Sequence, residues 1–289
     1  MDTITGKTIL ITGATNGIGK VAALELAKQG AQVVIVGRDP AKTEGTVREI
    51  RGQSSSQSVD GLVADLSSQA EIRRLAETFR QQYPRLDVLI NNAGGVFANR
   101  QLTVDGYERT FALNHLAYFL LTNLLLDRLQ ASAPARIINV SSRSHTRALM
   151  DFADLQNERQ YRMGGMRAYG QSKLANLLFT YELARRLAGT GVTVNAVHPG
   201  AVATGFGENN HGIMRLGMRV FHRFSLTPEE GADTLVYLAS SQEVATVTGK
   251  YWVKRQQVPS SLASYDLPTK KHLWSVSAQM TGIPDTVQV

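Results

Sequence analysis

Tyr169 and Lys173 stand four residues apart, and their types and spacing are those of a proton donor with a tuning charge. On an α-helix such a pair lies on one face, so the phenol and the ammonium can share a cavity. A free phenol has a pKa of about 10, and a nearby positive charge favours the phenolate, which makes its proton available near neutral pH. An aromatic core residue beside a solvated lysine gives the same spacing, so the pair indicates a catalytic site only together with other motifs.

A glycine-rich segment near the N-terminus has the pattern of a phosphate-binding turn. Residues 8–12 predict a short buried strand, residues 20–29 predict a helix, and Gly13, Gly17 and Gly19 stand between them. In a Rossmann unit such a turn directs backbone N–H groups and the helix N-terminus toward a pyrophosphate. A plain strand-to-helix connection is the alternative, and the flanking strand and helix favour the phosphate interpretation.

Several motifs in register resemble the short-chain dehydrogenase/reductase superfamily. They are residues 12–19, residues 91–94 (Asn-Asn-Ala-Gly), Ser142, and the Tyr169 and Lys173 pair. Residues 198–204 and 248–253, with Leu273 and Trp274, are more similar to its retinol-dehydrogenase-like subgroup. The resemblance covers nearly the whole chain. It implies an NAD(P)(H)-dependent oxidoreductase that interconverts an apolar aldehyde or ketone and its alcohol by hydride transfer.

The resemblance implies a role for each of four residues. Tyr169 is the proton donor or acceptor, and Ser142 hydrogen-bonds the substrate oxygen on which negative charge develops. Lys173 lowers the tyrosine pKa and holds the nicotinamide ribose, while Asn114 supports a water chain to the lysine. The local alternative for Asn114 is a hydrogen bond to a helix backbone. Ser141 cannot share the site with its neighbour, because adjacent strand residues point to opposite faces, and Ser142 is the one that matches the motif.

The resemblance also implies cofactor contacts along the strand ends. Asp65 and Leu66 would contact the adenine, although Asp65 is equally suited to cap a helix. Asn91 and its neighbours would lie along the adenosine ribose. The alternative or additional role of the asparagine side chains is to stabilise the sheet. The full expected set is Gly13, Thr15, Asn16, Gly17, Ile18, Gly19, Arg38, Asp65, Leu66, Asn91, Ala93, Gly94, Tyr169, Lys173, Pro199, Gly200, Val202 and Thr204.

The choice of cofactor is indicated at the end of the second predicted strand. Gly37 stands where an NAD-preferring site usually places a carboxylate, and Arg38 follows it. An arginine suits the 2′-phosphate of NADP, whereas an arginine that caps the turn or pairs with Asp39 is the alternative. NADP(H) is therefore the expected cofactor, and NAD(H) stays open.

Apolar strand candidates alternate with helical patterns along the chain. The candidates are residues 8–12, 32–36, 59–64, 88–91, 137–141, 193–197 and 251–253. This alternation predicts an α/β fold, a Rossmann-type doubly wound parallel sheet with helices on both faces, formed by a single NADP(H)-binding and catalytic domain over residues 1–289. Ligands of such sheets bind outside the carboxyl ends of the strands, which is where the motifs lie.

Composition and charge limit the other function classes. The chain has no cysteine, which removes disulfides and thiolate metal sites, and we expect no metal, with His145 and His198 as structural residues. The net charge of +7 is scattered rather than gathered in a basic block, so no nucleic acid is expected. The N-terminus lacks a signal pattern, and the apolar stretch at residues 111–126 is shorter than the roughly 20 residues of a membrane span, so we expect a cytoplasmic protein.

Residues 203–226 predict a substrate lid. Ile213, Leu216 and Val220 share one helical stripe, and arginines 215, 219 and 223 share another. The pattern suits a cover over an apolar substrate, a peripheral membrane contact, or a helix packed on its own core. The helices expected at residues 107–129 and 169–187 resemble those that pair in family dimers, so a homodimer or homotetramer is expected. A catalytically silent NADP(H)-binding scaffold or redox sensor is the alternative function.

Overall fold

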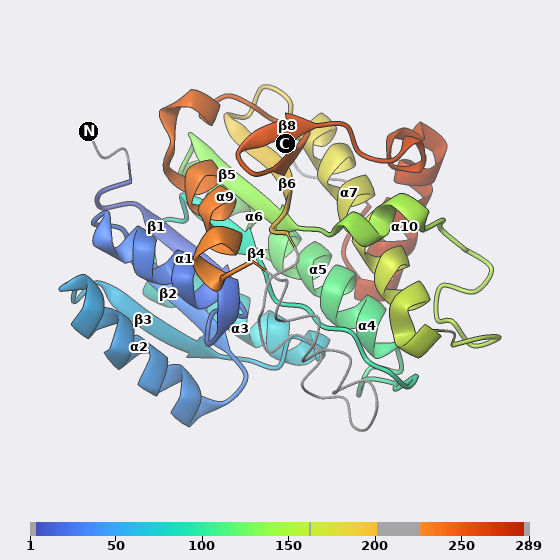
Figure 1. Ribbon diagram of the computed structural model, residues 1–289, viewed down its shortest axis with the longest axis horizontal. Helices are drawn as coiled ribbons and strands as arrows, with labels where there is room; N and C mark the ends of the chain where they lie inside the picture. Colours follow the sequence, from blue (N-terminus) through green and yellow to red (C-terminus); the bar gives the residue numbers. More distant parts are fainter. Residues whose placement is uncertain (1–3, 162, 201–225, 286–289) are drawn as a thin grey trace.

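The computed structural model describes residues 4–161, 163–200 and 226–285. Within them, eight strands form one sheet in the order β3-β2-β1-β4-β5-β6-β7-β8 (Figure 1). The strands are β1 Thr8–Thr12, β2 Gln32–Gly37, β3 Val59–Val63, β4 Val88–Asn91, β5 Ala135–Val140, β6 Val192–His198, β7 Lys250–Val253 and β8 Gln256–Val258.

The first seven strands run parallel, and only β8 is antiparallel, paired with β7. The predicted parallel α/β sheet is confirmed. β8 was missed because its three residues are largely exposed and carry no apolar alternation.

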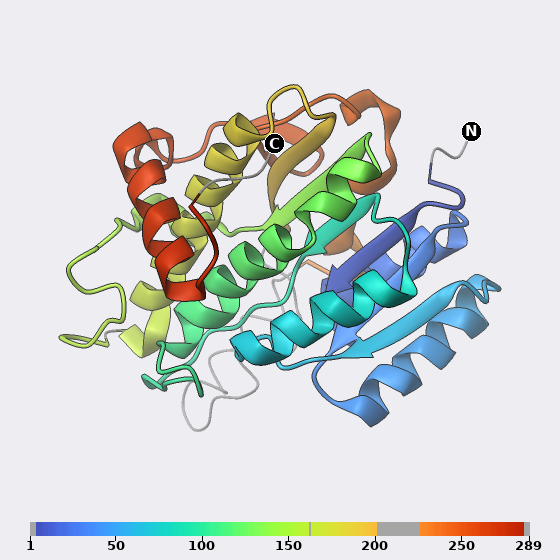
Figure 2. The same ribbon diagram turned by 180° about the vertical axis from the view of Figure 1, so that it is seen from behind.

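Helices cover both faces of the sheet (Figures 1 and 2). On one face lie α1 Gly17–Lys28, α2 Pro40–Ser54 and α9 Pro228–Ser240, which pack against Ile9 and Ile11 of β1. On the other face lie α3 Gln69–Gln82, α5 Ala117–Leu124, α6 Leu126–Ala131 and α7 Met166–Arg186, and here Leu10 points into the core. Strands buried on both faces explain the continuous apolar runs of the sequence.

The helix expected at residues 107–129 is interrupted. It begins with α4 Arg109–Phe111, continues as the π-helical turn η1 Ala112–Leu116, and then divides into α5 and α6. Short 3-10 turns complete the chain: η2 Arg143–Arg147, η3 Met163–Gly165, η4 Gln242–Val244 and η5 Leu262–Tyr265. π-helical turns are frequent at functional sites, and this one carries Asn114.

The C-terminal helix α10, Leu267–Thr281, packs on α7 and η1. Its buried Trp274 contacts the rings of Phe119 and Phe179, with centroids 4.9 and 5.9 Å away. The chain thus covers with its own C-terminus the helix faces that we expected to pair with a second copy. Burial within one chain accounts for the apolar pattern from which a dimer was expected.

Across residues 4–161, 163–200 and 226–285, no helix has both the length and the apolar character that crossing a bilayer requires.

Candidate active site

The glycine-rich turn after β1 has the geometry that a phosphate needs. Gly13 has φ +65°, and a Cβ atom there would lie 2.7 Å from Cα of Ala93, so only glycine fits. Asn16, at the N-cap of α1, makes no side-chain capping bond, and the first turn of α1 holds no acidic residue. The first N–H groups of α1 are therefore available to an anion, which the positive end of the helix dipole also favours.

Asn92 links this turn to the end of β4 by hydrogen bonds. Its Nδ2 donates to the carbonyl oxygens of Thr12 at 2.8 Å and Gly13 at 3.0 Å. In return, Oγ1 of Thr12 accepts from the backbone N–H groups of Asn92 and Ala93. Asn92 is not among the residues predicted from the sequence, although its place within the Asn-Asn-Ala-Gly motif was the available signal.

The side chain of Asn91 has a structural role. Its Nδ2 donates to Oγ1 of Thr122 and to Oδ1 of Asn139, both at 2.9 Å, in the fully buried core. The sheet-stabilising alternative therefore describes this amide, and any contribution of Asn91 to the adenosine ribose would come from its backbone. Ala93 and Gly94 follow at the strand end as expected.

The end of β2 leaves no room for a carboxylate. A Cβ atom at Gly37 would collide with the side chains of Thr43 and Thr15. Asp39 caps α2 by accepting from the N–H of Lys42 at 2.7 Å, rather than pairing with Arg38. Arg38 is exposed and forms no ion pair with any residue that the structure describes. Its guanidinium is therefore open to a ligand beside the phosphate-binding turn.

We expect Gly37→Asp to destabilise the protein without producing preference for NADH. The new side chain must displace Thr43 or Thr15, and overpacking of this kind costs about 1–3 kcal/mol. Thermal unfolding and an NADH titration measure both effects. Gly45→Asp is the matched control, because a Cβ atom at Gly45 meets nothing within 4 Å. Tighter NADH binding with an unchanged melting temperature would contradict the expectation.

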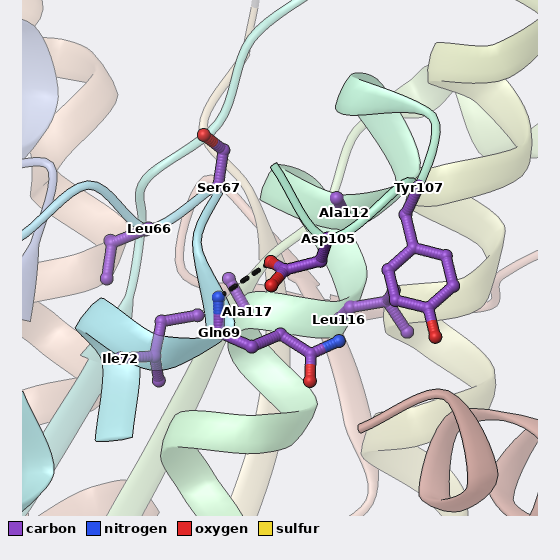
Figure 3. Close-up of a pocket in the computed structure, with 9 residues that line it drawn as sticks. All are labelled: Leu66, Ser67, Gln69, Ile72, Asp105, Tyr107, Ala112, Leu116 and Ala117. Atoms are coloured by element: carbon purple, nitrogen blue, oxygen red, sulfur yellow. Dashed lines mark hydrogen bonds between the residues drawn. The ribbon is translucent and has the colours of Figure 1, made fainter. Parts of the chain in front are cut away.

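Asp65 and Leu66 lie in the turn between β3 and α3. Oδ1 of Asp65 accepts from the N–H of Ser67 at 2.9 Å and from its hydroxyl at 2.8 Å, whereas Ser68 caps the helix. The helix-cap alternative for Asp65 is therefore wrong. Leu66 lines a cavity of about 10 Å³ beside the N–H of Gln69, which donates to Asp105 (Figure 3). Such a cavity has room for about one water molecule, so an adenine ring must lie outside it.

Ser142 and not Ser141 faces the site. The hydroxyl of Ser141 is buried and donates to the carbonyl oxygen of Lys173 at 2.8 Å. Ser142 follows the end of β5, where its side chain lies near enough to the Tyr169 phenol to lower its pKa, and its Oγ accepts from the N–H of Ser144 at 3.2 Å. The strand end and α7 together place the serine and tyrosine side chains beside each other.

Asn114 joins three elements through its fully buried amide. Oδ1 accepts from the N–H of Gly95 at 2.8 Å, and Nδ2 donates to the Gly95 carbonyl at 2.9 Å and to Oγ of Ser172 at 3.0 Å. These bonds tie η1 to the turn after β4 and to α7. Ser172, which was not among the predicted site residues, thus links Asn114 to the helix of Tyr169, whose carbonyl accepts from the same Ser172 hydroxyl.

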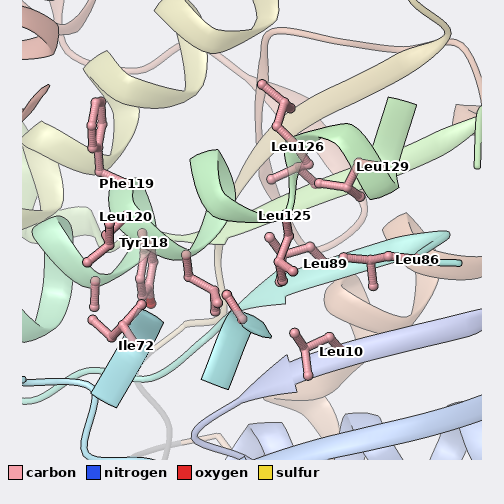
Figure 4. Close-up of a cluster of buried hydrophobic side chains, with 14 of the residues drawn as sticks. Leu10, Ile72, Leu86, Leu89, Tyr118, Phe119, Leu120, Leu125, Leu126 and Leu129 are labelled. Carbon is pink, nitrogen blue, oxygen red and sulfur yellow. The ribbon is translucent and has the colours of Figure 1, made fainter. Parts of the chain in front are cut away.

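Lys173 is almost completely buried at the centre of this group. Its Nζ donates to the carbonyl oxygen of Val140 at 3.0 Å and lies 5.6 Å from the ring centre of Tyr118. Tyr118 belongs to the hydrophobic cluster between α5, α3 and the sheet, which keeps water from this side (Figure 4). Burial lowers the pKa of Lys173 to about 7.

The protein by itself does not lower the pKa of Tyr169. Burial of the phenol raises its pKa to about 12, and the hydrogen bond to Ser142 acts in the opposite direction. Lys173 is not among the groups that act on this pKa in the protein alone, so its role in lowering the pKa stays a prediction. The ammonium is directed to the carbonyl of Val140, with Nζ 5.7 Å from the centre of the Tyr169 ring, and its own burial favours the neutral amine.

The remaining expected residues lie near β6 or outside the described ranges. Pro199 and Gly200 follow β6, and Gly200, with φ +91°, approaches the side chain of Leu226. Val202, Thr204 and the expected lid at 203–226, apart from Leu226, lie outside the described residues.

Burial lowers the pKa of His198 to about 4. In the described part of the chain, no group of three or more histidine or acidic side chains could hold a metal.

Known proteins are similar to this chain over its whole length. The short chain dehydrogenase family matches residues 7–154 and 156–212. Retinol dehydrogenase 13 from Homo sapiens is 44% identical over 287 residues, covering 97% of this chain and 86% of that protein. Retinol dehydrogenase 12 from Mus musculus is 43% identical over 280 residues, covering 97% and 88%.

Solved structures also resemble it. An uncharacterized protein from Mycobacterium Paratuberculosis superposes with a TM-score of 0.78 at 33% identity, covering 99% of this chain and 98% of that one. The Pseudomonas aeruginosa RhlG/NADP active-site complex has a TM-score of 0.68 at 30% identity, covering 86% and 94%.

Proposed function

The chain belongs to the short chain dehydrogenase family and is an NAD(P)-dependent oxidoreductase of alcohols and carbonyl compounds, and from this premise we propose that it prefers NADP(H) and acts on apolar aldehydes, ketones or alcohols. The observation that carries the proposal is the placement of Ser142 and Tyr169 beside the buried Lys173, at the carboxyl end of the sheet. The scaffold alternative requires no such cluster.

When bound, the nicotinamide supplies or accepts the hydride. In carbonyl reduction the Tyr169 hydroxyl delivers the proton to the oxygen on which negative charge develops, and the Ser142 hydroxyl donates a hydrogen bond to that same oxygen. Lys173 would hold the nicotinamide ribose, and in its protonated form it would add positive charge near the phenol. Asn114 and Ser172 fix the turn after β4 and the first turns of α7, so that the two hydroxyls converge.

Two features support the preference for NADP(H). The space at Gly37 excludes a carboxylate, and Arg38 is exposed and unpaired within the described residues. The start of α1, which has no side-chain cap, would serve the pyrophosphate of either cofactor. An arginine that meets a phosphate forms charge-assisted hydrogen bonds, which are about twice as strong as neutral ones. The second cofactor, NADH, has no 2′-phosphate for Arg38 to bind.

We expect Arg38→Ala to weaken NADPH binding by about 10–100-fold and to change NADH binding by less than about 2-fold, because only NADPH loses a charge-assisted contact. Fluorescence titration of both cofactors measures the two dissociation constants. Arg48→Ala in α2, the helix that follows Arg38, is the control, since Arg48 is exposed and paired with Glu44. Equal losses for both cofactors would contradict a specific role of Arg38.

The apolar substrate class is supported by the names of the similar proteins, which are retinol dehydrogenases, and by the apolar stripe at residues 213–224. The test follows NADPH consumption with retinal, linear alkyl aldehydes and cyclic ketones. Turnover that rises with the apolar size of the carbonyl compound would support the proposal. NADPH binding without consumption in any of these assays would favour the scaffold or redox sensor.

We also propose a cytoplasmic protein that forms a homodimer or homotetramer and makes a peripheral membrane contact through the lid. α10 covers the helix faces on which pairing was expected, so an oligomer needs another surface. Light scattering of the purified protein measures its mass. Cosedimentation with anionic vesicles tests the membrane contact.

A further inference from the structure

His145 makes a hydrogen bond with each of its ring nitrogens. It lies in η2, three residues after Ser142, with a relative exposure of 1%. Nδ1 is 2.6 Å from the carbonyl oxygen of Ser142, and Nε2 is 3.1 Å from the backbone nitrogen of Ser261. A backbone N–H can only donate, so Nε2 must accept. The proton of the neutral ring is then on Nδ1, which donates to the Ser142 carbonyl.

This bond acts on the orientation of Ser142. The same carbonyl oxygen also accepts from the backbone N–H of His145 at 3.2 Å, so it is held from two sides. Ser142 has φ −156° and ψ 155°, and its Oγ accepts from the N–H of Ser144. Holding the carbonyl fixes the backbone and thus the Cα–Cβ direction of Ser142, and the bond from the Ser144 N–H selects the rotamer in which Oγ faces Tyr169.

Ser261 is itself fixed to α7, the helix of Tyr169. The neighbouring Ser260 hydroxyl is 2.6 Å from the hydroxyl of Tyr181, and the ring of Tyr265 stacks on Tyr181 with centroids 5.2 Å apart. The segment at residues 260–265 is therefore attached to the C-terminal half of α7. Through His145 it reaches the end of β5, and it lies beyond residue 212, where the family match ends.

We propose that His145 is a positioning residue for Ser142, held in the Nδ1–H tautomer by the C-terminal segment at residues 260–265. The inference rests on the proposed function, because Ser142 matters only if its hydroxyl serves the reacting oxygen and Tyr169. The ring of Tyr251 covers one side of His145 at 5.1 Å in an edge-to-face arrangement. Its burial also lowers the pKa of His145, which keeps the ring in the neutral form that the two bonds require.

Four variants distinguish the effects of the two hydrogen bonds that the His145 ring makes. His145→Phe keeps a ring but removes both bonds, whereas His145→Asn keeps a donor for the Ser142 carbonyl. Ser261→Pro removes the N–H that Nε2 accepts, and the φ of −63° at Ser261 suits proline. Ser261→Ala removes the hydroxyl and keeps the N–H, so it is the matched control.

We expect His145→Phe and Ser261→Pro to lower kcat by about 10–100-fold, with KM for NADPH changed by less than about 2-fold. His145→Asn should recover part of the loss made by His145→Phe, and Ser261→Ala should resemble the wild type. A general loss of structure would instead change NADPH binding and the circular dichroism spectrum together.

Two readouts need no turnover. Nitrogen-15 NMR of the histidines should show Nδ1–H for His145 in the wild type. Ultraviolet difference titration against Tyr169→Phe should show a higher Tyr169 pKa in His145→Phe, because the Ser142 bond that lowers this pKa is disturbed. An Nε2–H tautomer, or an unchanged Tyr169 titration, would overturn the inference. Absence of turnover in the wild type with the NMR and titration results as expected would overturn only the proposed function.

Discussion

Tyr169→Phe should lower kcat by about 10²–10⁴-fold in both reaction directions, because the variant removes the proton donor and acceptor and little else. The ring remains in its buried place, and Ser142 keeps its bond with the N–H of Ser144. NADPH should bind within about 2-fold of the wild-type affinity. Steady-state rates with a carbonyl compound, together with a fluorescence titration of NADPH, measure the two quantities.

Tyr83→Phe is the control for the loss of a buried tyrosine hydroxyl. The hydroxyl of Tyr83 bonds Asp60 in β3, remote from the site, so its removal should affect stability and leave kcat unchanged. If Tyr169→Phe retained wild-type turnover, the proton would have to come from another group and the proposed mechanism would be wrong.

The second large effect concerns stability. We expect Lys173→Met to abolish most activity and yet to raise the melting temperature by about 5–10 °C below pH 7. The pKa of Lys173 is about 7 in the folded protein and 10.5 in its ordinary state. Between these values the unfolded chain binds more protons, so wild-type stability rises with pH, and below pH 7 the full cost of burying the ammonium is present.

Methionine removes this cost and fills the same space with an apolar chain. The carbonyl of Val140 is not left unpaired, because Nδ2 of Asn176 also donates to it at 3.2 Å. The gain in melting temperature should therefore shrink as the pH rises from 7 toward 10.5, as thermal unfolding of both proteins across that range would show. Lys28→Met, at a half-exposed lysine paired with Glu25, should show no such trend. A variant less stable than the wild type at pH 6 would contradict the argument.

Local patterns made much of the fold and part of the site predictable. The seven parallel strands lie within two residues of their predicted bounds, because strands buried on both faces give continuous apolar runs between turn signals. The strand β1, the glycine turn and α1 were also predictable, because their signals lie within neighbouring residues of the sequence. Tyr169 and Lys173 lie together because residues four apart on a helix share a face, which needs no tertiary contact.

Other features required the packed structure. Asn92 bonds a turn some 80 residues away in the chain, and Ser261 reaches His145 from a distance of 116 residues. No periodicity connects such pairs, since their contact depends on how the sheet and helices assemble. For the same reason, the sequence suggested a dimer from the apolar faces of two helices, whereas α10 of the same chain covers them.

The amino-acid sequence by itself determined the order of strands and helices, the glycine-rich turn and the four residue types of the proposed chemistry, because each is encoded within a few neighbouring residues. Only the tertiary structure decided which serine faces Tyr169, which amides hold the turns, and the direction of the two pKa shifts. Those shifts follow from the balance between burial and nearby charge, and burial exists only once distant segments have packed around the group.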